Sequence, residues 1–316
     1  MPDTILPHLA VAIDLGSNSF HATLIDRRPN ADGTAYTVIS RAGEKIQLAA
    51  GLDHNNVLSV EAIERGLNCL RRLAQKLTQV DPMNCHVVAT NTLRVAVNKA
   101  DFISPAELIL GVPIRVLTGE QEASLIFKGM VAEVSRTAHK HSEKLAIDIG
   151  GGSTEIILGN HSPRVMHSFA MGCVSFSQAF FAQRKITKLG IEEAVEVAQT
   201  IIASELPIYQ SNGWQVCIGS SGTVKALAHL SDQKEEGVWY LDLASMASIE
   251  RRILSFDSLD DVQMEALRPD RGEVLPAGYA ILKGIMLSFK LDRIYFSTGA
   301  LREGVLLSHT KPTHDG

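Results

Sequence analysis

The sequence lacks several patterns that would assign a protein to a broad class directly. It has no run of about 20 apolar residues, so it predicts no membrane-spanning helix. Asp14 interrupts the first apolar run, which argues against a secretory signal peptide. The four cysteines form no Cys-x-x-Cys pair, and the eleven histidines show no zinc-binding spacing. We therefore expect reduced thiols and a cytoplasmic location.

Charge and nucleotide-binding motifs exclude further classes. The formal net charge is −5, which argues against a protein that binds nucleic-acid polymers. No Gly-x-x-x-x-Gly-Lys-Ser/Thr motif occurs, so the protein is not a P-loop nucleotide-binding protein. The hydrophobic content of 45% and the charged content of 21% are typical of a globular protein. A chain of 316 residues is long enough for two domains with full cores.

Residues 144–158 combine an apolar strand, an aspartate, a glycine turn and a second strand. Asp148 ends the first strand, and three glycines and a serine follow. Because glycine has no Cβ and tolerates positive φ, such a turn can bring backbone N–H groups close to an anion. The carboxylate beside it can hold a hydrated Mg²⁺. The segment is a candidate phosphate-and-metal site, with an ordinary glycine-rich hairpin as the alternative.

The same pattern occurs a second time, 134 residues earlier, at Asp14. There Ala-Ile-Asp-Leu-Gly-Ser-Asn-Ser matches Ala-Ile-Asp-Ile-Gly-Gly-Gly-Ser around Asp148. Both turns lead into a strand rather than a helix, which excludes a Rossmann dinucleotide fingerprint. Two such hairpins one domain apart predict an α/β fold with two similar domains facing a shared cleft. This is the arrangement of the actin, sugar kinase and Hsp70 ATPase superfamily, whose domains have the ribonuclease H-like fold.

Apolar runs and helical periodicity predict the remaining elements. Strands are predicted near residues 9–15, 20–26, 35–41, 85–90, 114–117, 164–170, 216–218 and 294–297. Helices are predicted over 60–79, from 91 onward, and over 118–132, 190–206, 248–265, 277–290 and about 300–310. Residues 133–143 are predicted as a polar loop. We expect domain boundaries at 1–125 and 126–316, and the sequence leaves open whether the last helix packs back on the first domain.

Three further segments have both a functional and a structural interpretation. Arg94 is predicted in the first turns of a helix, where a cation opposes the helix dipole, so either a ligand-binding or a plain surface role is open. Glu122 follows a Thr-x-x-Gln capping box at Thr118, and an acid there also stabilises a helix start. Residues 219–223, Gly-Ser-Ser-Gly-Thr, lie between a strand and a helix. They predict an anion site or a plain connecting loop.

Six motifs together resemble the exopolyphosphatase and guanosine pentaphosphate phosphohydrolase (Ppx/GppA) family, in the family's order, over about residues 10–308. They are Asp14-Leu-Gly-Ser-Asn-Ser-Phe, Thr90-x-x-x-Arg94, Gly119-x-x-Glu122-Ala123, Asp148-Ile-Gly-Gly-Gly-Ser-Thr-Glu155, Gly219-x-Ser-Gly-Thr223 and Gly299-Ala-Leu-Arg-Glu-Gly304. The resemblance implies Mg²⁺-dependent removal of the terminal phosphate of polyphosphate or of the 5′ γ-phosphate of pppGpp. Longer members carry an additional C-terminal region related to HD phosphohydrolases, and we expect this chain to be a short form without it.

The resemblance also implies roles for individual residues. Glu122 would orient or deprotonate the attacking water, and Arg94 would stabilise phosphate charge. The implied metal ligands are Asp14, Asp148 and Glu155. The implied phosphate-binding residues are Gly16, Ser17, Asn18, Ser19, Gly150, Gly151, Gly152, Ser153, Gly219, Ser221, Gly222 and Thr223. Arg268, Arg271 and Arg302 either extend a basic track or are surface residues.

Several points stay open in the sequence. It does not distinguish polyphosphate from guanosine penta- or tetraphosphate as the ligand. A homodimer is one assembly that the resemblance allows. Two other functional classes use the same fold: an ATP-using kinase, and a non-catalytic sensor that binds (p)ppGpp or polyphosphate. The Glu122 motif argues against the kinase, and intact Glu122, Asp148 and Glu155 argue against the sensor.

Overall fold

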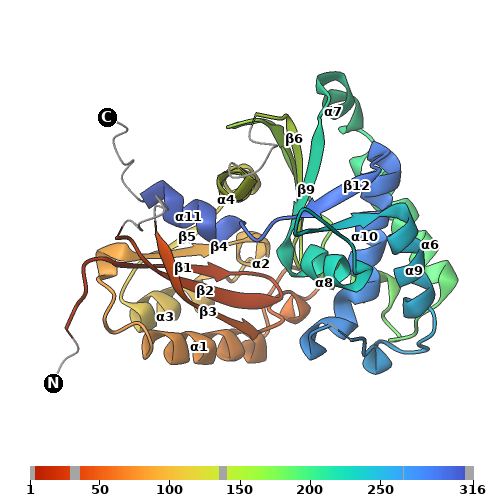
Figure 1. Ribbon diagram of the computed structural model, residues 1–316. Helices are drawn as coiled ribbons and strands as arrows, with labels where there is room; N and C mark the ends of the chain where they lie inside the picture. The colour runs from red at the N-terminus through yellow and green to blue at the C-terminus, as the bar shows by residue number, and fades with distance from the viewer. Residues whose placement is uncertain (1–3, 29–35, 135–140, 266, 310–316) are drawn as a thin grey trace. The chain divides into compact units, whose positions relative to one another are not determined.

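A computed structural model describes residues 4–28, 36–134, 141–265 and 267–309 (Figure 1). The chain forms two compact units, Met1–Leu125 with Leu301–Gly316 (unit 1) and Ile126–Ala300 (unit 2). The last helix, α11 (Leu301–His309), packs against β1 of unit 1. Helix α4 (Gly119–Val134) begins in unit 1 and ends in unit 2.

Unit 1 is built on a five-stranded sheet in the order β3-β2-β1-β4-β5. Its strands are β1 (Leu9–Leu15), β2 (Ser19–Asp26), β3 (Thr37–Lys45), β4 (Cys85–Ala89) and β5 (Ile114–Val116). β1, β2 and β3 are antiparallel neighbours, whereas β4 and β5 run parallel to β1. Because parallel strands end at the same edge of a sheet, the loops after β1, β4 and β5 meet at one edge.

Helices cover both faces of this sheet (Figure 1). Alternate residues of β1, from Leu9 to Leu15, share one apolar cluster with α1 (Val60–Ala74) and α3 (Ala100–Leu110). Helix α11 lies on the opposite side, where β1 presents the small residues Ala10 and Ala12. The shorter elements are α2 (Asn91–Val95), η1 (Ala49–Gly51) and η2 (Pro82–Asn84).

Unit 2 contains a seven-stranded sheet in the order β10-β11-β12-β9-β6-β7-β8. Its strands are β6 (Lys144–Ile149), β7 (Thr154–Gly159), β8 (Pro163–Phe169), β9 (Val216–Ser220), β10 (Lys234–Glu235), β11 (Val238–Asp242) and β12 (Arg293–Phe296). The run β8-β7-β6-β9-β12 has the same order and strand directions as β3-β2-β1-β4-β5 in unit 1. The prediction of two α/β domains of the actin-like class is confirmed, and the shared cleft stays a prediction.

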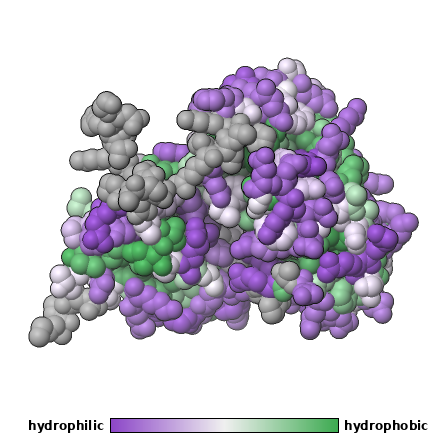
Figure 2. Space-filling model, in the orientation of Figure 1, coloured by the Kyte–Doolittle hydropathy of each residue, from purple (hydrophilic) through white to green (hydrophobic). Residues whose placement is uncertain are grey.

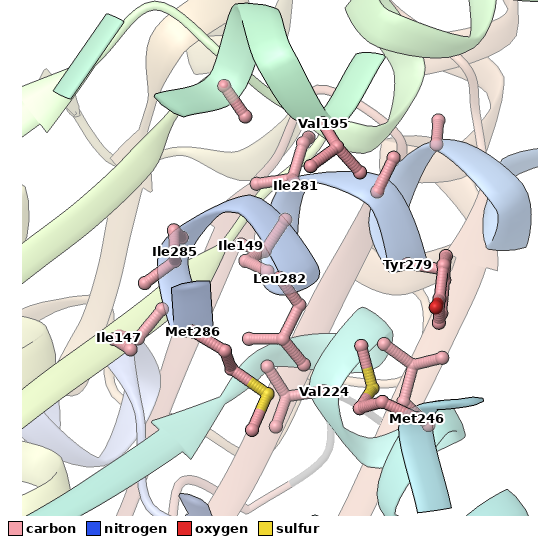
Figure 3. Close-up of a cluster of buried hydrophobic side chains, with 14 of the residues drawn as sticks. Ile147, Ile149, Val195, Val224, Met246, Tyr279, Ile281, Leu282, Ile285 and Met286 are labelled. Carbon is pink, nitrogen blue, oxygen red and sulfur yellow. The ribbon is translucent and has the colours of Figure 1, made fainter. Parts of the chain in front are cut away.

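The core of unit 2 forms around α10 (Leu275–Phe289), whose residues are buried on nearly all sides. Figure 3 shows Ile281, Leu282 and Met286 of this helix among side chains of β6 and α8. A helix that is apolar all round must be covered on every side. The other helices of unit 2 are α5 (Cys173–Phe180), α6 (Lys188–Ile202), α7 (Leu206–Asn212), α8 (Ser221–Ser231), α9 (Leu243–Ile253), η3 (Leu259–Asp261) and η4 (Pro269–Val274).

Several predicted boundaries were wrong. The helix predicted over 60–79 ends at Ala74, because the amides of Lys76 and Leu77 turn to carbonyls three residues back. The helix predicted over 248–265 is wrong in its second half, since α9 starts earlier and ends at Ile253. Helix α3, which carries Pro105 in its interior, and strands β10 and β11 were not predicted. Of the loop predicted over 133–143, residues 135–140 lie outside the described residues.

Candidate active site

In unit 1, the first predicted phosphate turn is a closely packed loop after β1. A Cβ built on Gly16 would lie 2.9 Å from the Ser19 carbonyl oxygen, so a side chain there would push the turn open. The Asn18 carbonyl accepts hydrogen bonds from the amides of Ile46 and Gln47, at 2.9 and 2.8 Å. Residues 17–19 are each at most 6% exposed. The segment that follows β3 therefore holds the turn in place through the Asn18 carbonyl.

Buried polar atoms in this turn have no internal partner. Within the described part of the chain, the side-chain amide of Asn18 and the hydroxyl of Ser19 find no hydrogen-bond partner. Ser17 Oγ accepts a hydrogen bond of 2.7 Å from Thr92 Oγ1, and both residues are buried. Buried polar groups are normally paired, so unpaired donors beside a glycine turn are consistent with a polar ligand.

Arg94 and Glu122 form an ion pair at the same edge of unit 1. Arg94 Nη1 lies 2.8 Å from Glu122 Oε2 and donates to the Leu117 carbonyl at 3.0 Å. Glu122 is 6% exposed, whereas Glu120 is exposed. Thr118 and Gln121 make the predicted reciprocal capping bonds, of 3.1 and 3.2 Å. The capping box therefore sets the start of α4 and places Glu122 against Arg94.

One argument for Arg94 was wrong. Helix α2 has only five residues, and Arg94 lies in its last turn, where a cation suits the helix dipole. The indication of a ligand-binding role from an unfavourable dipole position is therefore lost. What the structure provides instead is the contact with Glu122. A direct contact between Arg94 and phosphate stays a prediction.

In unit 2, the second predicted turn has the same local geometry. A Cβ on Gly150 would lie 3.1 Å from the Ser153 carbonyl oxygen, as at Gly16. The start of α5 packs on this turn, since the Cys173 amide donates to the Gly150 carbonyl at 2.9 Å and the Val174 amide to the Gly151 carbonyl at 2.9 Å. These bonds use the carbonyl oxygens of Gly150 and Gly151 as acceptors. The amides of residues 151–153 have no hydrogen bond to another described residue.

Asp148 and Glu155 lie directly opposite one another on β6 and β7. Ser220 Oγ donates a short hydrogen bond to Asp148, and Ser168 Oγ donates to Glu155 Oε1 at 2.6 Å. Register also pairs Asp148 with Ser220 and Glu155 with Ser168. The four side chains form a polar row across four neighbouring strands, on one face of the sheet.

The row brings two acids together. Carboxylates directly opposite on antiparallel strands destabilise a sheet unless a cation or proton lies near them. Glu155 is only 1% exposed, so of the two acids Asp148 has the greater access to solvent. In unit 1, His21 takes the place of Glu155, because it lies opposite Asp14. Asp14 is half-buried and is the penultimate residue of β1, which spans Leu9–Leu15 as predicted.

The third turn, residues 219–223, joins β9 to α8. Ser221 has φ +97°, which is strained for a residue with a side chain. Its hydroxyl accepts hydrogen bonds from the amides of Thr223 and Val224, at 3.1 and 3.2 Å. Ser221, the first residue of α8, therefore satisfies two amides in the first turn of that helix. A hydroxyl that accepts such bonds can still donate one of its own.

A basic side chain lies against this turn. A Cβ on Gly222 would overlap the Arg271 guanidinium, so glycine is required for the arginine to lie on the backbone there. Of the three arginines that the sequence suggested as a basic track, Arg271 is therefore beside a predicted phosphate turn. Arg268 belongs to the same unit, at the start of η4, and Arg302 lies on α11 in unit 1.

Sequence reasoning missed three residues that support the predicted site, namely Thr92, Ser168 and Ser220. Ser220 directly follows a predicted strand parallel to β6, so its place beside Asp148 could have been inferred from sheet pairing. For Thr92 and Ser168 no local signal exists, because their partners are set by register.

Among the described residues, no group of three or more His, Cys, Asp or Glu side chains is arranged to hold a metal ion. Across the same residues, no helix has the length and apolar character needed to cross a membrane. On the face shown in Figure 2, hydrophilic side chains predominate, with apolar ones between them.

Comparisons with known proteins identify relatives of this chain. A family model described as the Ppx/GppA phosphatase family matches residues 26–313. A guanosine-5′-triphosphate,3′-diphosphate pyrophosphatase of Vibrio atlanticus (strain LGP32) is 38% identical over 308 residues. That alignment covers 96% of this chain and 60% of the relative, so the chain spans about three-fifths of the length of that relative.

Solved structures share the fold. An exopolyphosphatase from Cytophaga hutchinsonii is similar with a TM-score of 0.83 at 21% identity, covering 95% of this chain and 97% of the other. A Ppx/GppA family member from Aquifex aeolicus is similar with a TM-score of 0.73 at 23% identity, covering 95% and 96%. Because the family model matches residues 26–313 of this 316-residue chain, the chain belongs to the Ppx/GppA phosphatase family.

Proposed function

We propose that the protein is a phosphohydrolase that releases the terminal phosphate of inorganic polyphosphate, the 5′ γ-phosphate of pppGpp, or both. The observation that carries this proposal is the buried Glu122, held by Arg94 at 2.8 Å at the edge of the sheet where the Gly16–Ser19 turn lies. An ionised acid with a fixed orientation beside an anion-binding turn is what water attack on a phosphate requires. The names of the relatives above support these two substrates.

We assign the phosphate contacts to the three turns. Backbone amides and hydroxyls of 16–19, 150–153 and 219–223 would bind phosphate oxygens, and the unpaired side-chain groups of Asn18 and Ser19 support this assignment for the first turn. Arg271, lying on Gly222, would add a positive charge there. Preorganised donors of this kind stabilise the charge that develops in phosphoryl transfer.

The acidic residues fit Mg²⁺ as a cofactor. Mg²⁺ prefers oxygen ligands and commonly uses one or two carboxylates together with water and substrate phosphates. The opposed carboxylates of Asp148 and Glu155 would be stabilised by such a cation, and Asp14 is the matching acid of unit 1. We assign Asp148, with Glu155 beside it, as the candidate ligands of unit 2, and Asp14 as the candidate ligand of unit 1. A bound Mg²⁺ would neutralise phosphate oxygens and polarise the bond to the leaving group.

The chemistry assigned to the chain itself is short. Glu122 orients a water molecule and takes one of its protons as the water oxygen bonds to the terminal phosphorus. The bond from phosphorus to the bridging oxygen breaks, and that oxygen leaves with the shortened chain or nucleotide. Arg94 holds the Glu122 carboxylate in position for this proton transfer.

Phosphate release tests the proposal against both alternatives. The protein is incubated with Mg²⁺ and either polyphosphate or pppGpp, without any acceptor, and free phosphate is measured. Release from either substrate supports the hydrolase. Phosphate transfer that requires an added acceptor would show a kinase, and tight binding of either compound without turnover would show a sensor. The cytoplasmic location and a homodimer stay predictions.

A further inference from the structure

Glu133 accepts three hydrogen bonds from the chain that follows β12. Ser297 Oγ donates to Glu133 Oε2 at 2.8 Å, Thr298 Oγ1 to Oε1 at 2.6 Å, and the Gly299 amide to Oε2 at 2.6 Å. Glu133 lies in the last turn of α4, where a negative charge is unfavourable for the helix dipole. Charge-assisted bonds from three donors offset this cost. The end of α4 therefore holds residues 297–299 in place.

The approach of this segment to α4 is close. A Cβ on Gly299 would overlap the Gly129 carbonyl oxygen, so only glycine lets the chain pass there. Ser297 is 3% exposed and Gly299 is buried, whereas Glu133 is half-buried and Thr298 is exposed. The contact is thus closely packed at Ser297 and Gly299 and open to solvent at Thr298.

Ser297 also connects this contact to the turn at 219–223. Its amide donates to the Gly219 carbonyl at 2.8 Å, directly after Phe296 and Gly219 pair between β12 and β9. One residue therefore bonds Glu133 through its side chain and the end of β9 through its backbone. Gly219 is also the first residue of the turn at 219–223.

Side chains closely surround the backbone of Gly219. A Cβ on it would lie 2.9 Å from Val224 Cγ1 and 3.0 Å from Ile294 Cγ2, so the backbone is enclosed between α8 and β12. A displacement of the end of β12 would therefore also displace Gly219 and the first turn of α8. The amides of that first turn are the groups that bind phosphate in the proposed function.

We propose that Glu133 is a positioning residue for the phosphate-binding turn at 219–223, acting through Ser297. Glu133 fixes Ser297, and Ser297 fixes the end of β9 from which the turn starts. This inference rests on the proposed function, because it concerns the same phosphate site. Its direct consequence is that the turn keeps its donors aimed before substrate arrives, which favours binding.

Three variants separate this role from a general contribution to stability. Glu133→Gln weakens the acceptor, and Ser297→Ala removes the hydroxyl that bonds Glu133 while keeping the amide that bonds Gly219 of β9. Thr298→Val is the matched control, because Thr298 also bonds Glu133 but has no hydrogen bond to β9 among the described residues. We expect Glu133→Gln and Ser297→Ala to raise KM for phosphate release by about three- to tenfold, with kcat nearly unchanged. Thr298→Val should leave KM unchanged.

Amide hydrogen exchange of residues 219–224, measured without substrate, gives a readout that does not depend on activity. Faster exchange there in Glu133→Gln and Ser297→Ala, and wild-type exchange in Thr298→Val, is the expected result. Unchanged exchange in the first two variants, or equal effects in all three, would overturn the proposal. If the wild-type protein releases no phosphate from either substrate, the proposed function fails, and the exchange measurement still decides this inference. Ser297→Ala also keeps the test available if Glu133→Gln does not fold.

Discussion

The Arg94 guanidinium and the Glu122 carboxylate are 2.8 Å apart, and Glu122 is nearly buried while Glu120, two residues earlier, is exposed. Of Glu120 and Glu122, the two acids in the first turn of α4, Glu122 is the one that contacts Arg94. The contact holds the Glu122 carboxylate in one orientation. Glu120 shares the helix start and its dipole, so it serves as a natural control.

Glu122→Gln should reduce kcat for phosphate release by a factor on the order of 10²–10⁴, because glutamine cannot accept the proton of the attacking water. Binding of the substrate should be retained, since the amide keeps the size of the side chain. Glu120→Gln should have near-normal activity. Steady-state phosphate release and equilibrium binding provide the measurements. Small and equal effects at both positions would leave Glu122 as a helix-start acid only.

Arg94→Ala should lower both stability and activity. It leaves Glu122 without the cation that faces it, at a cost of about 1–3 kcal/mol in the free energy of unfolding. Arg94→Lys should lie between wild type and alanine, because a single ammonium group cannot reproduce the planar contacts with the carboxylate and the Leu117 carbonyl. Urea denaturation and kcat are measured for both variants. A destabilised Arg94→Ala protein with full kcat would make the pair purely structural.

Asp148→Asn should weaken the dependence of turnover on Mg²⁺ by at least about tenfold in the metal concentration required. The change keeps the shape of the side chain and its contact with Ser220, but removes the charge. Asp242→Asn is the control in the same unit, because Asp242 caps α9 and has no assigned role at the site. Mg²⁺ titration of phosphate release, after removal of metal by a chelator, measures both. Equal Mg²⁺ dependence in the two variants would argue against Asp148 as a ligand.

Ser221→Gly and Ser221→Ala should differ in stability but not in activity. Glycine relieves the positive φ, worth on the order of 1–2 kcal/mol, while losing a cap worth about 1 kcal/mol. Alanine loses the cap and keeps the strain, so it should be the less stable of the two. Both lose the hydroxyl donor and should show the same increase in KM. If both variants keep wild-type KM, Ser221 is a helix cap without a phosphate contact.

Acid should destabilise unit 1 through His86. Burial, and then the nearby positive charges of His309, Arg27 and Arg115, lower the pKa of His86 from 6.5 to about 4. His86 of β4 stacks on His309 of α11 with ring centroids 3.7 Å apart. Because the unfolded chain binds this proton at higher pH than the folded one, stability is full above about pH 6.5 and is lost as pH falls toward 4.

His86→Phe keeps the stacking surface and removes the titrating group. The fall in unfolding temperature between pH 7 and pH 4 should therefore be smaller than in wild type, by on the order of a few degrees. His54→Gln, at an exposed histidine of the same unit, should keep the wild-type pH dependence. Thermal unfolding across this pH range measures the difference. An unchanged pH dependence in His86→Phe would contradict the assignment.

The two-domain α/β architecture could be predicted from the sequence because the same hairpin motif occurs twice. The hairpins at Asp14 and Asp148 are local, and each depends on its own glycines, so both appeared with the predicted strands on either side. The capping box at Thr118 was predicted for the same reason, since its partners lie three residues apart. Local chemistry can be read without knowledge of the fold.

The contacts that complete the site are not local. Arg94 meets Glu122 across 28 residues, Ser220 meets Asp148 across 72, and Ser297 meets Glu133 across 164. Each depends on strand order and register, which no short segment encodes. The positive φ of Ser221 could not be predicted either, because serine commonly occurs between a strand and a helix without such strain. Element ends set by packing, such as Ala74 in α1, were misjudged for the same reason.

The position of α11 on β1 has a consequence for how the protein is made. Unit 1 takes its last helix from beyond unit 2, which occupies the 175 residues Ile126–Ala300. At about 5–20 residues per second, a ribosome needs roughly 10–35 s to make that stretch. During this time the first sheet is without the helix that packs over Ala10 and Ala12. Although unit 2 comes later in the sequence, its polypeptide is complete before that of unit 1.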